Sequence, residues 1–176
     1  DYTVLHSALL FDHPFARVVK DTLEVRGQRR PYYYLTSPVE AVATVGLNER
    51  GEILLTRQYR HPIGRVILDL PAGRMNPGED PLTGARREFE EETGFYPREI
   101  QPLGSYNQFP GSMRVTTHLF FARDLVPTRQ NLDEGEELEL VALPAAEVLA
   151  LILRGEVLDG SLQLGVLLAA QKGWLA

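Results

Sequence analysis

The pattern of apolar and polar positions divides the chain into a β-rich part, one helix, a second β-rich part and two closing helices. Short apolar runs bounded by turn residues are typical of strands. Such runs predict short strands with turns within residues 2–36, and further strands at 39–47, 53–59, 66–70, 100–108, 115–122 and 138–143. Apolar residues at helical spacing predict two closing helices at 145–154 and 161–172.

The central helix has sequence signals at both ends. Asp80 is a good N-cap residue, Pro81 suits the first helical position, and Gly94 is placed to end the helix. Three apolar positions recur at helical spacing and are expected to face the core: Leu82, Ala85 and Phe89.

This order of elements predicts an α+β fold, an α/β/α sandwich in which a mixed β-sheet lies between helices. Residues 1–38 have few helix signals and are expected to form a small N-terminal β appendage. Gly27 and the run Arg29-Arg30-Pro31 are expected to break its strands. Residues 39–176 then form the main domain.

Composition narrows the class of protein. The 176 residues carry a net charge of −6 and no basic run, which argues against a nucleic-acid partner. No apolar run approaches the ~20 residues of a membrane helix. The absence of cysteine fits a reducing compartment, and residues 1–11 lack a signal-peptide pattern, so we expect a cytoplasmic protein without a membrane partner.

A cluster of acidic residues marks the central helix. Glu88, Glu91 and Glu92 stand at i, i+3 and i+4, so they project from one face, opposite the apolar one. Like charges at this spacing cost roughly 0.2–0.5 kcal/mol per pair. Hard divalent cations bind such oxygen ligands, so the cluster predicts Mg²⁺, or Mn²⁺ in its place. The plainer interpretation is a solvated acidic helix face.

The spacing around this cluster is specific. Residues 73–95 read GRMNPGEDPLTGARREFEEETGF, with seven named positions in fixed register: Gly73, Glu79, Arg87, Glu88, Glu91, Glu92 and Gly94. At about 7% usage each, these positions match by chance on the order of 10⁻⁸ per starting point. The stretch resembles the Nudix box. The only variation is aromatic residues, Phe89 and Phe95, at two usually aliphatic positions.

The box assigns roles to its flanking residues. Gly73 lets the preceding loop turn tightly, which frees the carbonyl of Ala72 as a metal ligand. Arg87 is expected to point away from the Glu88 face and to hold the loop, and we count it with Glu91 among the catalytic candidates. Glu79 either braces the loop or reaches the metal through water, and we count it with the substrate-binding residues.

Further segments resemble the ADP-ribose pyrophosphatase (nucleoside diphosphate sugar hydrolase) group of Nudix hydrolases. They are Leu70-Pro71-Ala72-Gly73, the strand Arg57-Gln58-Tyr59-Arg60, and Pro110, sixteen residues after Gly94. The resemblance implies hydrolysis of a pyrophosphate bond in a nucleoside diphosphate-linked small molecule. It also implies that Arg60, with Arg57, binds phosphate, and that the chain forms a homodimer through exchanged N-terminal strands.

A second acidic cluster covers residues 133–137. Relatives carry a Glu-x-Glu on a mobile loop here, which implies that Glu134 is the general base and Glu136 a metal ligand. Glu137 and Glu139 are the alternatives if the register differs. Taken alone, the cluster reads as a solvated acidic loop.

The substrate's ends are less defined. Tyr32, Tyr33 and Phe109 are candidates to stack on a base, and Gly111 and Ser112 are expected to touch the substrate. Many relatives have an acidic residue four positions after this glycine, where the present chain has Val115, next to Arg114. Alternative substrates are therefore FAD, CDP-alcohols or another nucleotide sugar, and the alternative to an enzyme is a non-catalytic ADP-ribose sensor.

Overall fold

The structure, a computed structural model, describes residues 1–175 of the chain, and these fall into two compact units. The first unit comprises Asp1–Glu40 and Tyr106–Thr116. The second comprises Ala41–Ser105 and the residues from Thr117 onward. The loop segment 106–116 thus joins the N-terminal residues in one unit, a grouping that the sequence did not indicate.

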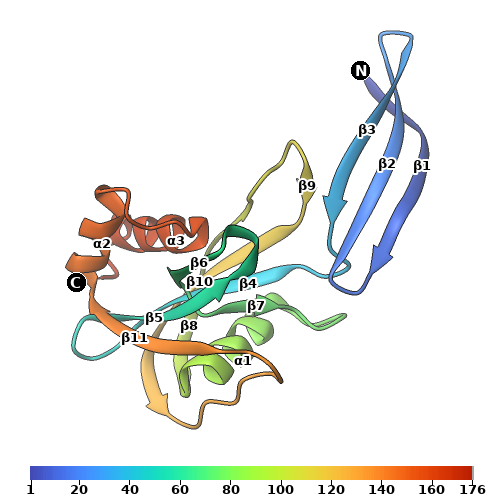
Figure 1. The fold of residues 1–176 in the computed structure, drawn as a ribbon. Coiled ribbons are helices and arrows are strands. Elements are labelled where there is room, and N and C mark those ends of the chain that lie inside the picture. Colours follow the sequence, from blue (N-terminus) through green and yellow to red (C-terminus); the bar gives the residue numbers. More distant parts are fainter. Residues whose placement is uncertain (176) are drawn as a thin grey trace. The chain divides into compact units, whose positions relative to one another are not determined.

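The first unit is a four-stranded sheet (Figure 1). Its strands lie in the order β1 (Tyr2–His13), β2 (Ala16–Val25), β3 (Gln28–Thr36) and β9 (Met113–Arg114). The first three are antiparallel, and β9 runs parallel to the end of β3.

The prediction of short, broken strands in this segment is wrong, because β1, β2 and β3 are 12, 10 and 9 residues long. Arg29-Arg30-Pro31, the expected break, lies inside β3. Among the described residues, β3 pairs with β9 only at Leu35 and Thr36. Pro31 therefore lies where the strand has an open edge, and a missing backbone N–H is tolerated there.

The second unit contains a mixed sheet, as predicted. Its main order is β11 (Leu138–Pro144), β5 (Glu52–Arg60), β4 (Ala41–Leu47), β10 (Thr116–Pro127) and β8 (Phe95–Asn107). β10 is parallel to β4, whereas β11 is antiparallel to β5. The short strands β6 (Arg65–Asp69) and β7 (Ala72–Arg74) pair with β5 and β4, and a 3₁₀ turn, η1 (His61–Ile63), connects β5 to β6.

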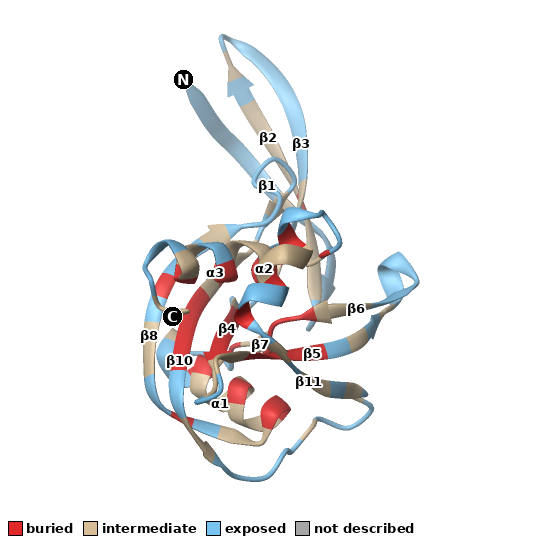
Figure 2. Cartoon of the chain, turned by 90° about the vertical axis from the view of Figure 1, so that its left-hand side faces the viewer, coloured by how far each residue is buried: buried red, intermediate tan, exposed pale blue. Residues whose placement is uncertain are grey.

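Helices cover both faces of this sheet (Figure 2). They are α1 (Pro81–Thr93), α2 (Ala145–Leu153) and α3 (Gly160–Gln171). On β4, Gly46 lies against the ring of Phe89 in α1, whereas its neighbour Val45 lies against Gly165 in α3. Successive strand residues point to opposite faces, so α1 and α3 pack on opposite sides of β4. The predicted α+β sandwich is confirmed.

The predicted limits of α1 are also confirmed. Asp80 caps the first turn by accepting hydrogen bonds from two backbone N–H groups, and Gly94 ends the helix at φ 70°. Ala85 and Phe89 are fully buried, but Leu82 is 36% exposed, so its predicted place in the core is wrong. Leu82 lies in the first helical turn, at the solvent-facing end. Within residues 1–175, no helix is both long and apolar enough to span a membrane.

Candidate active site

The three glutamates of α1 lie in different environments. The side chain of Glu91 is 34% exposed, that of Glu88 is 15% exposed, and Glu92 is 4% exposed. The expectation of one common, non-core face is therefore wrong for Glu92. The strand β7 packs over this part of α1 and buries the residue, because the Ala72 N–H donates a 2.9 Å hydrogen bond to the Glu92 carboxylate.

Gly73 brings β7 against the helix. A Cβ atom at this position would overlap the carboxylate of Glu88. The tight turn predicted for Gly73 is thus a close approach of backbone to a glutamate side chain. Ala72 and Gly73 together place two carboxylates, those of Glu92 and Glu88, beside one short segment of backbone.

Arg87 is the centre of an ion-pair network. Its guanidinium contacts Glu79 at 2.9 Å, Glu88 at 2.7 Å and Glu91 at 3.0 Å, and donates to the Arg74 carbonyl. The expectation that Arg87 points away from the Glu88 face is wrong, since its guanidinium contacts both Glu88 and Glu91. Its expected ion pair with the loop is present.

Glu79 braces the loop that precedes α1. Its carboxylate accepts from the Asn76 N–H at 2.8 Å as well as from Arg87. The hydrogen bonds from Arg87 lower the pKa of Glu79 to about 2. Of its two predicted roles, the structure displays loop bracing.

Burial and neighbouring acidic groups disfavour ionisation of the carboxyl groups on this part of α1. Burial raises the pKa of Glu92 to about 8, with the negative charges of Glu136 and Glu88 acting in the same direction. Burial also raises the pKa of Glu88, and Glu136 again contributes. The charge of Glu136 thus acts on both helix carboxylates, whereas Glu134 is exposed on the same loop.

The acidic loop is tied to the C-terminal end of α1. The backbone N–H of Thr128 donates to the Gly94 carbonyl at 2.7 Å, and that of Asn131 donates to the Glu91 carbonyl at 2.8 Å. The Gln130 side chain donates to the Glu92 carbonyl at 2.7 Å. Helix ends leave carbonyls that need such partners, but nothing in the sequence identifies Gln130 as the donor.

The arginines of β5 are both paired. Arg57 contacts Glu139 at 3.0 Å across the β5–β11 pair, and this ion pair engages an alternative candidate for the base. Arg60 contacts the buried Asp69, with Nε at 2.6 Å and Nη2 at 2.5 Å from Oδ2. Sequence reasoning missed Asp69, although an acid inside the apolar run Val66–Leu70 is a signal of a buried polar partner.

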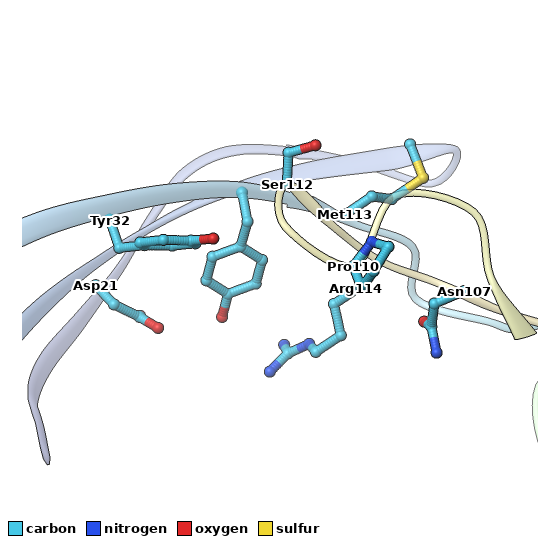
Figure 3. A pocket seen from close by; sticks show the side chains of 8 residues that line it. Asp21, Tyr32, Asn107, Pro110, Ser112, Met113 and Arg114 are labelled. Atoms are coloured by element: carbon cyan, nitrogen blue, oxygen red, sulfur yellow. The ribbon is translucent and has the colours of Figure 1, made fainter. Parts of the chain in front are cut away.

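The remaining candidates belong to the first unit, which contains a cavity of about 390 Å³ (Figure 3). Tyr32 and Ser112 line it, and the Tyr32 hydroxyl donates to the Gly111 carbonyl. Phe109 and Tyr33 are exposed and are not among its lining residues. The cavity also includes residues that sequence reasoning did not place there: Asp21, Tyr34, Asn107, Pro110, Met113 and Arg114.

Comparison with known proteins identifies the family. A family model described as NUDIX domain matches residues 37–160. The chain belongs to the Nudix family. The predicted Nudix box is therefore confirmed, and the protein is a Nudix hydrolase.

Named Nudix relatives resemble most of the chain. It is 33% identical over 141 residues to an ADP-ribose pyrophosphatase of Bacillus subtilis, spanning 75% of this chain and 76% of the relative. It is 34% identical over 128 residues to a methanol dehydrogenase activator of Bacillus methanolicus, spanning 72% and 69%. A crystal structure of an ADP compounds hydrolase superposes with a TM-score of 0.87 at 26% identity, covering 98% of this chain and 95% of that one.

Nudix hydrolases generally need a divalent metal, and the donor chemistry here fits one. Glu88, Glu92 and Glu136 are mutually repelling carboxylates, the hard oxygen ligands that such ions take. Within the described residues, no three acidic or histidine side chains already stand in coordinating geometry. Arg87 engages Glu88 and Glu91, and the Ala72 N–H engages Glu92.

Proposed function

We propose that this Nudix hydrolase cleaves the pyrophosphate bond of ADP-ribose or a related nucleoside diphosphate sugar, with Mg²⁺ as its metal. The products would be a nucleoside monophosphate and a sugar phosphate. The observation that carries the proposal is that Glu88 and Glu92 lie against the backbone of Gly73 and Ala72, and that the charge of Glu136 acts on both. Names of relatives support the substrate class, since they include pyrophosphatases of ADP-ribose, ADP-sugar and GDP-mannose.

The roles of the side chains follow from their positions. Glu88, Glu92 and Glu136 would hold the metal, with Glu91 and the Ala72 carbonyl completing the set. The bound cation supplies Lewis-acid chemistry, neutralising phosphate charge and activating water. We assign Glu134 as the base that takes the proton of the attacking water. Arg60 would bind a phosphate oxygen, since its side chain is 42% exposed beside the cluster.

The residues that we propose as contacts for the two ends of the substrate lie outside the Nudix box. For the base, Tyr32 is the strongest of the aromatic candidates, because it lines the cavity of the first unit together with Ser112. Arg114 lies in the same cavity with its guanidinium carbon 5.1 Å from the centroid of the Tyr34 ring. A positive charge here favours an anionic or electron-rich group on the substrate.

A substrate panel tests this function. ADP-ribose, other nucleotide sugars, FAD, CDP-alcohols and dinucleoside polyphosphates are incubated with Mg²⁺ or with EDTA, and release of monophosphate is measured. We expect metal-dependent cleavage that is fastest with ADP-ribose or another nucleoside diphosphate sugar. Preference for FAD or a CDP-alcohol would support pyrophosphate hydrolysis but replace the nucleoside diphosphate sugar as the substrate. Cleavage of nothing would favour a sensor that binds ADP-ribose without hydrolysis.

We also propose that the enzyme is a homodimer and acts in the cytoplasm. The first unit has no helix, and its longest strand, β1, exposes several large apolar side chains: Tyr2, Val4, Leu9, Leu10 and Phe11. Exposed apolar groups on a small sheet are typical of a surface that another chain covers. A second copy of this chain is the occupant that the family resemblance implies.

A further inference from the structure

The Arg60 guanidinium is paired with Asp69 on one side, and the Arg60 side chain is partly exposed to solvent. Its Nε and Nη2 atoms both contact Oδ2 of Asp69, at 2.6 and 2.5 Å. Asp69 is 3% exposed, whereas the Arg60 side chain is 42% exposed. A surface ion pair between two mobile side chains contributes little, but here one partner is fixed inside the fold.

The backbone fixes Asp69 firmly. It is the last residue of β6 and pairs with Thr56 of β5. Its other carboxylate oxygen, Oδ1, is buried and has no hydrogen-bond partner among residues 1–175. A buried carboxylate without a counter-charge is costly. Asp69 thus depends on Arg60 for compensation of its charge.

The charge of the anchored arginine acts on the carboxylate cluster. The positive charge of Arg60 acts on Glu92 of α1 and on Asp159, the N-cap residue of α3. The charge of one guanidinium therefore acts on carboxylates of α1 and of the α3 N-cap, while the guanidinium itself contacts Asp69 of β6. Its third nitrogen, Nη1, makes no contact with Asp69.

We propose that Asp69 is a positioning residue, which fixes the Arg60 guanidinium beside the metal-binding carboxylates so that Nη1 meets a substrate phosphate oxygen. The inference rests on the proposed function and adds a residue outside the Nudix box to it. A free arginine loses side-chain entropy when it binds a ligand. Asp69 removes that loss before the substrate arrives, so it acts on binding rather than on the chemical step.

The test is steady-state kinetics of Asp69→Asn with ADP-ribose and saturating Mg²⁺, together with binding of a non-hydrolysable α,β-methylene analogue. Without the Asp69 carboxylate, the charge-assisted hydrogen bond between Arg60 and the substrate phosphate is lost. KM and the analogue Kd therefore rise about tenfold, and kcat changes less than about twofold. Arg60→Ala produces a similar or larger rise. The double variant is no worse than Arg60→Ala alone, because Asp69 acts only through Arg60.

Glu99→Gln is the matched control. It removes the acidic partner of Arg123, 2.5 Å away on the surface, and leaves KM unchanged. If Asp69→Asn does not fold, Arg60→Lys tests the same geometry. It keeps the charge but cannot bridge Asp69 and phosphate with separate nitrogens, and its KM rises as for Arg60→Ala.

Two results would overturn this inference but leave the proposed function standing. The first is an Asp69→Asn or Arg60→Lys enzyme with the wild-type KM and Kd. The second is independent, additive effects of the two substitutions in the double variant. If the wild-type protein neither binds the analogue nor cleaves any nucleoside diphosphate, the proposed function fails, and the role of Asp69 fails with it.

Discussion

At the scale of single residues, three glutamates of one helix differ because their surroundings differ. Glu91 shares Arg87 with Glu88 and remains partly exposed, whereas Glu92 is buried beneath β7. Burial makes ionisation of Glu92 unfavourable until a cation is present. A metal ion would therefore do more for Glu92 than for Glu91, since it would compensate a charge that water does not reach.

Glu92→Gln is the first substitution to make. The amide oxygen still accepts from the Ala72 N–H, so we expect the fold to persist and the melting temperature not to fall. Loss of the charge should lower kcat by about 10²–10³-fold, the usual effect of removing one electrostatic group from an active site. Glu90→Gln, on the same helix, is the control and should behave as wild type. Near-wild-type turnover of Glu92→Gln would remove this residue from the metal site.

Gly73→Ala tests the close approach between β7 and α1. The new methyl group would occupy the position of the Glu88 carboxylate, so either the side chain or the strand must shift. We expect a stability loss of about 1–3 kcal/mol, as for other overpacked sites, and at least tenfold lower activity. Urea unfolding and kinetics measure the two effects. Gly160→Ala is the control, because no atom lies near the added methyl group; equal losses in both variants would contradict the explanation.

At the scale of elements, the N-cap residue of α3, Asp159, has a raised pKa. Asp159 accepts a hydrogen bond from the Leu162 N–H at 2.6 Å, and burial raises its pKa from 3.8 to about 6. The facing charges are Asp69, which raises this pKa further, and Arg60, which lowers it. The folded protein thus holds a proton on Asp159 more tightly than the unfolded chain does.

The raised pKa of Asp159 makes the stability of the fold depend on pH. Between about pH 4 and pH 6 the native state binds more protons at this site than the unfolded state, so the contribution of Asp159 to stability falls as pH rises. Asp159→Asn keeps the cap acceptor and removes the titration. As pH rises through this window, we expect the urea midpoint of the variant to increase relative to that of the wild type. A difference that stays constant with pH would show that Asp159 titrates normally.

The elements also explain what the sequence could predict. Asp80, Pro81 and Gly94 set the limits of α1 through contacts within a few residues, so local chemistry was sufficient. The long strands of the first unit were missed, because polar residues and Pro31 look like turn signals unless the open edge of β3 is known. Asp69 and Gln130 were missed for a different reason: their partners, Arg60 and the Glu92 carbonyl, are nine or more residues away in sequence.

The acidic loop shows a further limit. Composition alone predicts a solvated segment, and only the family resemblance pointed to Glu136. The charge of Glu136 acts on Glu88 and Glu92, and the assignment of Glu134 as base stays a prediction. Spacing within a helix is readable from sequence, because the helix repeat is fixed. The position of a loop residue depends on anchors such as the Asn131 N–H, which no pattern encodes.

At the scale of the whole molecule, one face of the first unit carries apolar side chains. On β2, Val19 and Leu23 lie on the same face, since strand residues two or four apart share a side. Their partners on β1 are Leu9 and Val4, which are 51% and 56% exposed. This face therefore combines apolar side chains from two strands of the first unit, whose described residues include no helix.

Leu9→Glu tests whether a second copy covers this face. We expect the wild-type protein to have about twice the 19.8 kDa chain mass in light scattering after size-exclusion chromatography. A glutamate at residue 9 would need to be desolvated in the interface, so the variant should shift to the monomer mass at micromolar concentration. Leu153→Glu is the control, because Leu153 is 79% exposed in the second unit and should leave the dimer intact. A monomeric wild type, or dissociation by Leu153→Glu alone, would refute a dimer built on the first unit.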